Sequence, residues 1–184
     1  MNNGKRAYTL SILVEDTPGV LSQVARLFSR KGYNIESICA GATTKPGITR
    51  ISVIAVVDEA AIRQLATQLS KLLLVISVEV LTGDDSIHRE LTFIKVKAET
   101  RDQRDEIIQI VNVFRASILD MGKESLTIAV VGDDEKTKAI IDLLEGFGIL
   151  ETARSGTIAL QRGKHTIYDY NKTKEEYDYG KSLI

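Results

Sequence analysis

The sequence has little of what disulfide bonds, membrane insertion and nucleic-acid binding require. Its 184 residues include a single cysteine, Cys39, so no internal disulfide can form and a reducing compartment is expected. The 24 basic and 25 acidic residues nearly cancel, which leaves no electrostatic footprint for nucleic acid or an acidic membrane surface. No apolar run approaches the about 18 residues of a membrane-spanning helix, and no apolar signal segment precedes the first predicted strand. We therefore expect a cytoplasmic protein with no nucleic-acid or membrane partner.

Catalytic and metal-binding constellations are also missing from the sequence. The two histidines, His88 and His165, stand far apart, and Cys39 lies in an apolar strand pattern, where core packing is the more common role. No cluster of cysteine and histidine suggests zinc, and neither a Walker lysine motif nor a Gly-x-Gly-x-x-Gly fingerprint is present. We predict that this chain is not an enzyme and has no catalytic residue, metal site or cofactor.

Regular apolar patterning is what the sequence does have, and hydrophobic residues make up 43% of it. Four segments place apolar residues at i, i+3, i+4 and i+7, as an amphipathic helix does. They are Leu21, Val24, Ala25 and Phe28; Ile62, Leu65, Ala66 and Leu69; Ile107, Ile110, Val111 and Phe114; and Ile140, Leu143, Leu144 and Phe147. Segments of period 2, rich in β-branched residues, predict strands at 8–14, 35–42, 49–57, 74–81, 89–98, 116–121, 126–131 and 149–160.

The order strand, helix, strand, strand, helix, strand therefore occurs twice. A polar cluster at residues 82–86 marks the seam between the two halves. Each half has the ferredoxin-like order, in which two helices pack on one face of a four-stranded antiparallel sheet. We predict an α+β fold of two βαββαβ units in tandem, with domains at 1–82 and 83–163. The polar, tyrosine-rich tail at 164–184 is expected to be disordered or loosely docked.

The sheet face opposite the helices also needs cover. In the first half this face must carry some of the residues Leu13, Ile54, Val56 and Val75, which are too apolar to face water together. Pairing of sheets or edges between subunits would provide that cover, so we expect at least a dimer.

The junction VEDTPGVLSQV (residues 14–24) has the composition of a ligand-binding helix start. Pro18 suits the first helical position, and either Thr17 or Asp16 could cap the helix. Gly19 has no side chain, so an anion such as a carboxylate could approach the first-turn amides and the positive end of the helix dipole. Asp16 could accept hydrogen bonds from an ammonium group. Such a pair of receptors would suit a free α-amino acid, although the same spacing also occurs in a simple turn and cap.

A second segment, KGYNIES (residues 31–37), follows the first helical stripe. Gly32 is predicted to end that helix in the left-handed conformation that glycine adopts freely. Asn34 begins the next strand, and its side-chain amide could bind a carboxylate or an ammonium group, or could only satisfy loop backbone.

These two segments resemble a known family. EDTPGVLSQVARLFSRKGYNIESI (15–38) looks like the opening of the regulatory (small) subunit of acetohydroxyacid synthase, also called acetolactate synthase. The resemblance continues through ITRISVIAV, QLSKLLLVISV, HRELTFIKVKA, VNVFRASILDMGKESLTIAVVG and FGILETARSGTIALQRG, and covers about residues 7–163. GYNIES and ARSG, inside this arrangement, are its more specific parts. The tail beyond Gly163 lies outside the resemblance.

The resemblance implies an ACT domain, an amino-acid-binding module, in the first half. It implies a homodimer through the ACT domains and a partner, the catalytic subunit of acetolactate synthase, which this chain would activate and subject to feedback inhibition by a branched-chain amino acid, usually valine. Thiamine diphosphate, magnesium and FAD would belong to that catalytic subunit. The implied effector site consists of Asp16, Thr17, Pro18, Gly19, Val20 and Leu21, with Asn34 and Ile35 contributed by the partner chain. Many members have asparagine where Asp16 stands.

Three other functions are compatible with the same strand order. A free-standing ACT-type sensor could regulate another enzyme. An acylphosphatase-like enzyme would need an anion-binding loop with a nearby arginine. An RNA-recognition module should carry stacking aromatic residues on its central strands, but the predicted strand at 49–57 has none.

Overall fold

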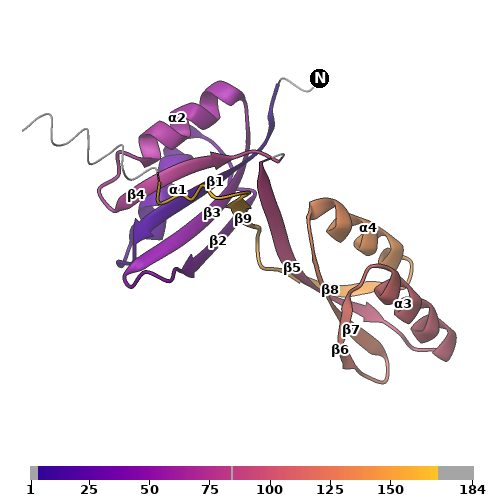
Figure 1. Ribbon diagram of the computed structural model, residues 1–184. Helices are drawn as coiled ribbons and strands as arrows, with labels where there is room; N and C mark the ends of the chain where they lie inside the picture. The colour runs from indigo at the N-terminus through magenta and orange to yellow at the C-terminus, as the bar shows by residue number, and fades with distance from the viewer. Residues whose placement is uncertain (1–3, 84, 170–184) are drawn as a thin grey trace, which may run out of the picture. The chain divides into compact units, whose positions relative to one another are not determined.

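The computed structural model describes residues 4–83 and 85–169 (Figure 1). Contacts within this range divide the chain into two units, one of residues 4–87 with 158–169 and one of residues 88–157. We predicted that the second domain extends from residue 83 to 163. In the structure, the residues from Ile158 onward belong to the first unit instead. The described helices include none long and apolar enough to cross a membrane.

The first unit is a four-stranded antiparallel sheet with two helices on one face. Its elements are β1 (Arg6–Glu15), α1 (Val20–Lys31), β2 (Ser37–Ala42), β3 (Ile48–Val57), α2 (Glu59–Leu69) and β4 (Val75–Leu81). The strand order is β2-β3-β1-β4, so β2 and β4 are the edges (Figure 1). This arrangement confirms the predicted ferredoxin-like order.

Alternation along the central strand β1 separates the two faces of this sheet. Leu10 lies opposite Val53 of β3 and Val80 of β4. These side chains face the helices, where Phe28 of α1 and Leu65 of α2 are buried in the same core. Because side chains along a strand point to opposite faces in turn, the residues between them face the other way.

The apolar stripe of α1 is rotated relative to the prediction. Val24 and Phe28 are buried as predicted, but Val20 and Leu27 complete the buried face. Leu21 is 45% exposed and does not belong to the core. It is therefore available to a ligand or a partner.

The outer face of the first sheet carries a buried polar row. Cys39, Ser52, Ser11 and Glu79 lie opposite one another on neighbouring strands β2, β3, β1 and β4. Burial raises the pKa of the Glu79 carboxyl, and the positive charge of Arg50 opposes this rise. The Glu79 carboxyl therefore stays protonated to a higher pH than an exposed glutamate does.

The chain's own C-terminal segment (residues 158–169) covers much of this outer face. Strand β9 (Ile158–Gln161) pairs with β5 (Ser86–Lys97) and lies against β1 and β4, with Ala159 buried. Ile167 and Leu13 are also buried. The outer face therefore does not by itself require a second subunit, contrary to the argument made from the sequence. Of the predicted tail, residues 164–169 pack on the first unit, and residues 170–184 lie outside the described range.

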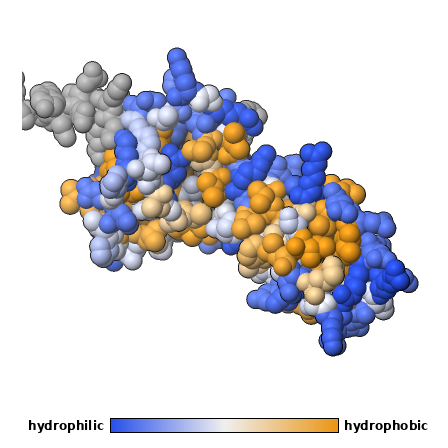
Figure 2. All heavy atoms as spheres, turned by 60° about the horizontal axis from the view of Figure 1, so that its bottom comes forward, coloured by the Kyte–Doolittle hydropathy of each residue, from blue (hydrophilic) through white to orange (hydrophobic). Residues whose placement is uncertain are grey.

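The second unit repeats the same topology. Its elements are β5 (Ser86–Lys97), α3 (Arg101–Val113), β6 (Ser117–Met121), β7 (Ser125–Gly132), α4 (Asp134–Glu145) and β8 (Ile149–Arg154), with strand order β6-β7-β5-β8. Ile94, Ile107, Ile128 and Ile140 are fully buried between the sheet and its two helices. Asp133 caps α4 by accepting a hydrogen bond from the Lys136 amide, as expected of an acidic helix start. On the outer face Leu91, Phe93 and Val131 remain partly exposed, and apolar side chains gather on this unit in Figure 2.

The single strand predicted at 149–160 is wrong, because the chain turns between β8 and β9. Gly156 has a φ of 79°, a left-handed conformation that ends the strand. Ser155 pins the turn to β5: its amide donates to the Leu91 carbonyl at 2.9 Å, and its Oγ accepts from the Leu91 amide at 3.1 Å. The ARSG motif is thus the corner at which the chain leaves the second sheet.

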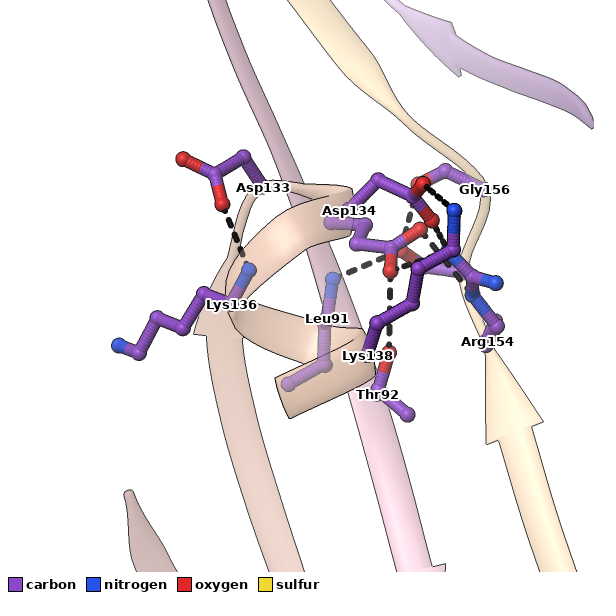
Figure 3. A network of polar contacts seen from close by, with 10 residues as sticks. Leu91, Thr92, Asp133, Asp134, Lys136, Lys138, Arg154 and Gly156 are labelled. Atoms are coloured by element: carbon purple, nitrogen blue, oxygen red, sulfur yellow. Dashed lines mark hydrogen bonds and ion pairs between the residues drawn. The ribbon is translucent and has the colours of Figure 1, made fainter. Parts of the chain in front are cut away.

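Arg154, at the end of β8, joins this corner to the rest of the second unit (Figure 3). Its guanidinium donates to both carboxylate oxygens of Glu90 on β5, at 2.5 and 3.2 Å, and to Asp134 at the start of α4, at 3.0 Å. The hydrogen bond from Lys138 is the main reason that the pKa of the Asp134 carboxyl lies below its usual value; partial burial opposes it and Arg154 adds to it. The Glu90 side chain is only 3% exposed, so Arg154 neutralises a buried charge.

We predict that Arg154→Met lowers the free energy of unfolding by about 2 kcal/mol, because Glu90 would be left buried without its cation. The Arg154 side chain is itself 43% exposed, so water reduces the loss below that of a fully buried pair. Lys138→Met is the matched control: it also removes a cation from Asp134, but from a solvent-exposed pair, and should change the free energy of unfolding far less than Arg154→Met does. Urea titrations of the two variants measure the difference, and equal losses would contradict the prediction.

Candidate effector site

The loop between β1 and α1 is held in place by its backbone. The Asp16 amide donates to the Gly47 carbonyl in the β2–β3 turn at 2.8 Å, and the Glu15 amide donates to the Leu74 carbonyl before β4 at 2.9 Å. The loop thus lies beside the β2–β3 turn, at the end of the sheet where β1 finishes. Gly47, with a φ of 74°, was not among the predicted site residues, although the Pro46-Gly47 turn signal could have marked it.

The helix start differs from the predicted cap. Helix α1 begins at Val20, and its N-cap is Gly19, with φ 89° and ψ −4° and no side-chain hydrogen bond. The predictions that Thr17 or Asp16 caps the helix and that Pro18 is its first residue are wrong. The Val20 amide donates to the Thr17 carbonyl at 3.3 Å, and the angles of Gly19 are those of the third residue of a type II turn, which follows a proline readily.

This turn leaves the helix start open to an anion. The Val20 amide is used in the turn and the Gln23 amide donates to Gly19, but no side chain caps α1, so the Leu21 and Ser22 amides between them keep their capacity to donate. The helix dipole adds a positive potential. A Cβ placed on Gly19 would meet no atom within 4 Å, so the space before the helix is empty. The Thr17 hydroxyl is buried without a hydrogen-bond partner in the described part of the chain and could bind a group placed there. The local geometry suits a carboxylate.

The other two predicted site residues, Asn34 and Ile35, follow the C-terminal end of α1. Gly32 ends the helix in the left-handed conformation, as predicted, and its amide donates to the carbonyls of Phe28 and Ser29. Asn34 is exposed, and its Nδ2 donates to Glu36 Oε1 at 3.0 Å, which leaves Oδ1 as an acceptor. Ile35 is half-buried against the core.

One chain therefore does not bring the two halves of the predicted site together. Helix α1 has 12 residues, and an α-helix rises 1.5 Å per residue, so its ends are about 18 Å apart. Asp16 to Leu21 lie at one end, and Asn34 and Ile35 lie at the other. A site that contains both sets needs a second copy of the chain.

No candidate metal site appears in the described residues: no three histidine, cysteine, aspartate or glutamate side chains gather where they could hold a metal ion.

The first unit, with its sheet order, its two helices on one face and its open first loop, is an ACT domain. The family model described as the AHAS small subunit-like ACT domain matches residues 10–77. A second model, described as the small subunit of acetolactate synthase, matches residues 89–163.

Known proteins agree with these matches over nearly the whole chain. The acetolactate synthase small subunit of Mycolicibacterium smegmatis is 44% identical over 167 residues, 91% of this chain and 98% of that protein. A probable small subunit from Methanothermobacter thermautotrophicus is 45% identical and covers 87% of this chain and 95% of its own length. The crystal structure of the Thermotoga maritima small subunit superposes with a TM-score of 0.80 at 34% identity, over 87% of this chain and 99% of that one. The chain belongs to the acetolactate synthase small-subunit family.

Gly19→Ala tests the positive φ at the start of α1. We expect it to lower the free energy of unfolding by about 1 kcal/mol or more, because a side chain is strained at φ 89° even where space is free. The control is Gly146→Ala at the end of α4, where φ is −60° and the space is equally free. That change should be neutral or stabilising by a few tenths of a kcal/mol up to about 1 kcal/mol. Thermal or urea unfolding compares the two, and a Gly19→Ala variant as stable as the control would contradict the assigned turn.

Proposed function

We propose that this chain is the non-catalytic regulatory subunit of an acetolactate synthase. It binds a catalytic subunit, raises the activity of that subunit, and makes it sensitive to feedback inhibition by a branched-chain amino acid, with valine as the first candidate. In this proposal thiamine diphosphate, magnesium and FAD belong to the catalytic subunit. The supporting observation is the uncapped start of α1 behind a loop that contains Asp16, in a chain of this family.

The chemistry of the loop suits a free amino acid. A carboxylate would accept hydrogen bonds from the Leu21 and Ser22 amides in the first turn of α1. The ammonium group would lie toward the Asp16 carboxylate and the Asn34 Oδ1 acceptor. A branched apolar side chain would contact Leu21, which is 45% exposed, and Ile35. Burying such a side chain contributes about 1.5–3 kcal/mol, which favours branched-chain over small or polar amino acids.

The geometry of one unit indicates how two copies would complete the site. Strand β2 is an edge strand, so its outer backbone groups can pair with another strand. Antiparallel pairing of β2 with its copy about a two-fold axis places the start of one β2 beside the end of the other. Asn34 and Ile35 precede β2, and the turn after β2 holds Asp16 through Gly47. The six residues of β2 extend about 20 Å, close to the length of α1, so the spacing of the two ends matches.

Reconstitution tests the regulatory role. The purified chain should form no acetolactate by itself, and adding it to its catalytic subunit should raise the rate and introduce inhibition by valine. The catalytic subunit alone, assayed with and without valine, is the control. Acetolactate formation by this chain after rigorous removal of the partner would contradict the non-catalytic role, and an unchanged rate on addition would contradict activation.

Complementation tests whether the effector site lies between two copies. Asp16→Ala and Asn34→Ala should each weaken valine binding by about tenfold or more, since each removes a partner of a charged group. When the two variants are mixed and allowed to exchange subunits, each heterodimer contains one site with both changes and one intact site. About a quarter of the sites should then bind valine at the original affinity.

Calorimetric titration of the mixture measures this recovery. A site within one chain would carry one defect in every copy, so no recovery in a mixture shown to contain heterodimers would contradict the shared site. Chains that stay monomeric in sedimentation with and without valine would contradict it as well.

A further inference from the structure

The outer face of the first sheet contains a cavity that the effector site does not use. It has a volume of about 380 Å³ and lies between β2 and β3 on one side and the C-terminal segment on the other. Its lining residues alternate with core residues such as Ile51 and Val53, so the cavity opens on the face away from α1 and α2. It belongs entirely to the first unit.

Arg50 supplies the cavity with a positive charge. This residue is half-buried, and among the described residues no ion pair is formed by its guanidinium, although its charge acts on the Glu79 carboxyl. A guanidinium has five N–H donors in a planar fork that matches a carboxylate, so a half-buried one without an ion pair favours an anionic ligand. The hydroxyl groups of Thr44 and Ser52 also line the cavity and could assist.

The opposite wall of the cavity is apolar. Ile158 and Leu160 of β9 line it, each 53% exposed, while Ala159 between them faces the sheet and is buried. The Tyr168 ring closes one side and is held by Lys45, whose Nζ lies 3.9 Å from the ring centroid. A ligand with an apolar body would remove Ile158 and Leu160 from water, which stabilises its binding.

We propose that this cavity is a second ligand site, for a small monocarboxylate with an apolar chain, such as a branched 2-oxo acid or fatty acid. The carboxylate would pair with Arg50, and the chain would lie against Ile158, Leu160 and Tyr168. No aspartate or glutamate lines the cavity, so the ammonium of an amino acid would have no partner there. This site lies on the opposite face of the sheet from α1 and does not depend on the proposed effector site.

Binding of 4-methylpentanoate, with 4-methylpentanamide as its uncharged analogue, tests the proposal. We expect the acid to shift amide resonances of residues 39–52 and 158–168 in the full chain, and the amide analogue to bind at least tenfold more weakly. Arg50→Gln should weaken acid binding by at least tenfold, whereas Arg26→Gln, an exposed arginine on α1, should not. Leucine, which has the same branched chain with an ammonium group, should not shift these resonances.

A second variant separates loss of the site from loss of the fold, because Arg50 also acts on the buried Glu79. Leu160→Trp fills the cavity but retains Arg50, and should abolish binding, while Leu143→Trp on α4, equally exposed at 53%, should leave it unchanged. No shift with up to about 10 mM acid, equal binding of acid and amide, or full binding by folded Arg50→Gln or Leu160→Trp would each overturn the proposal. Valine titration of the same variants reports on the effector site separately.

Discussion

The alternation of side chains along β1 organises the first unit. This strand is paired with β3 and β4, and the residues of both of its faces are buried. Residues such as Leu10 and Ile12 build the core under the helices, and Ser11 and Leu13 face the other way. The same strand ends at Glu15, where hydrogen bonds to Leu74 and Gly47 hold the loop that begins at Asp16. The position of the candidate effector loop is therefore a consequence of the sheet register.

The length of α1 sets a second constraint. A rigid helix separates the Asp16–Leu21 loop from Asn34 by about 18 Å, so no local adjustment brings them together within one chain. The free edge of β2 offers a way in which a two-fold pairing could do so, because the strand and the helix have nearly the same length. In the proposed function, regulation by a small ligand would be linked to assembly, because a ligand that contacts two copies would stabilise the dimer by mass action.

The turn at Gly156 has effects in both units. Arg154 anchors the end of β8 to Glu90 and Asp134, and Ser155 pins the corner to Leu91. Beyond this corner the chain returns to the first unit as β9 and covers a polar face that would otherwise be exposed. The cavity beside Arg50 exists only because this segment returns. The specific ARSG motif is thus explained by packing in the second unit.

The sequence by itself determined the repeated βαββαβ order, since period-2 and period-3.6 patterns depend only on which face each residue presents to the core. It also located Gly32, because a left-handed residue after an apolar stripe strongly favours glycine, and it marked the loop at Asp16–Gly19. It did not reveal that Gly19 rather than Thr17 is the N-cap of α1, because either cap is compatible with this sequence and the choice depends on the turn that the loop forms. Only the tertiary structure decided that the predicted strand at 149–160 breaks at Gly156, and that its second half leaves the second sheet for the first unit. These outcomes depend on contacts between residues far apart in the chain, such as Arg154 with Glu90, which no local pattern encodes.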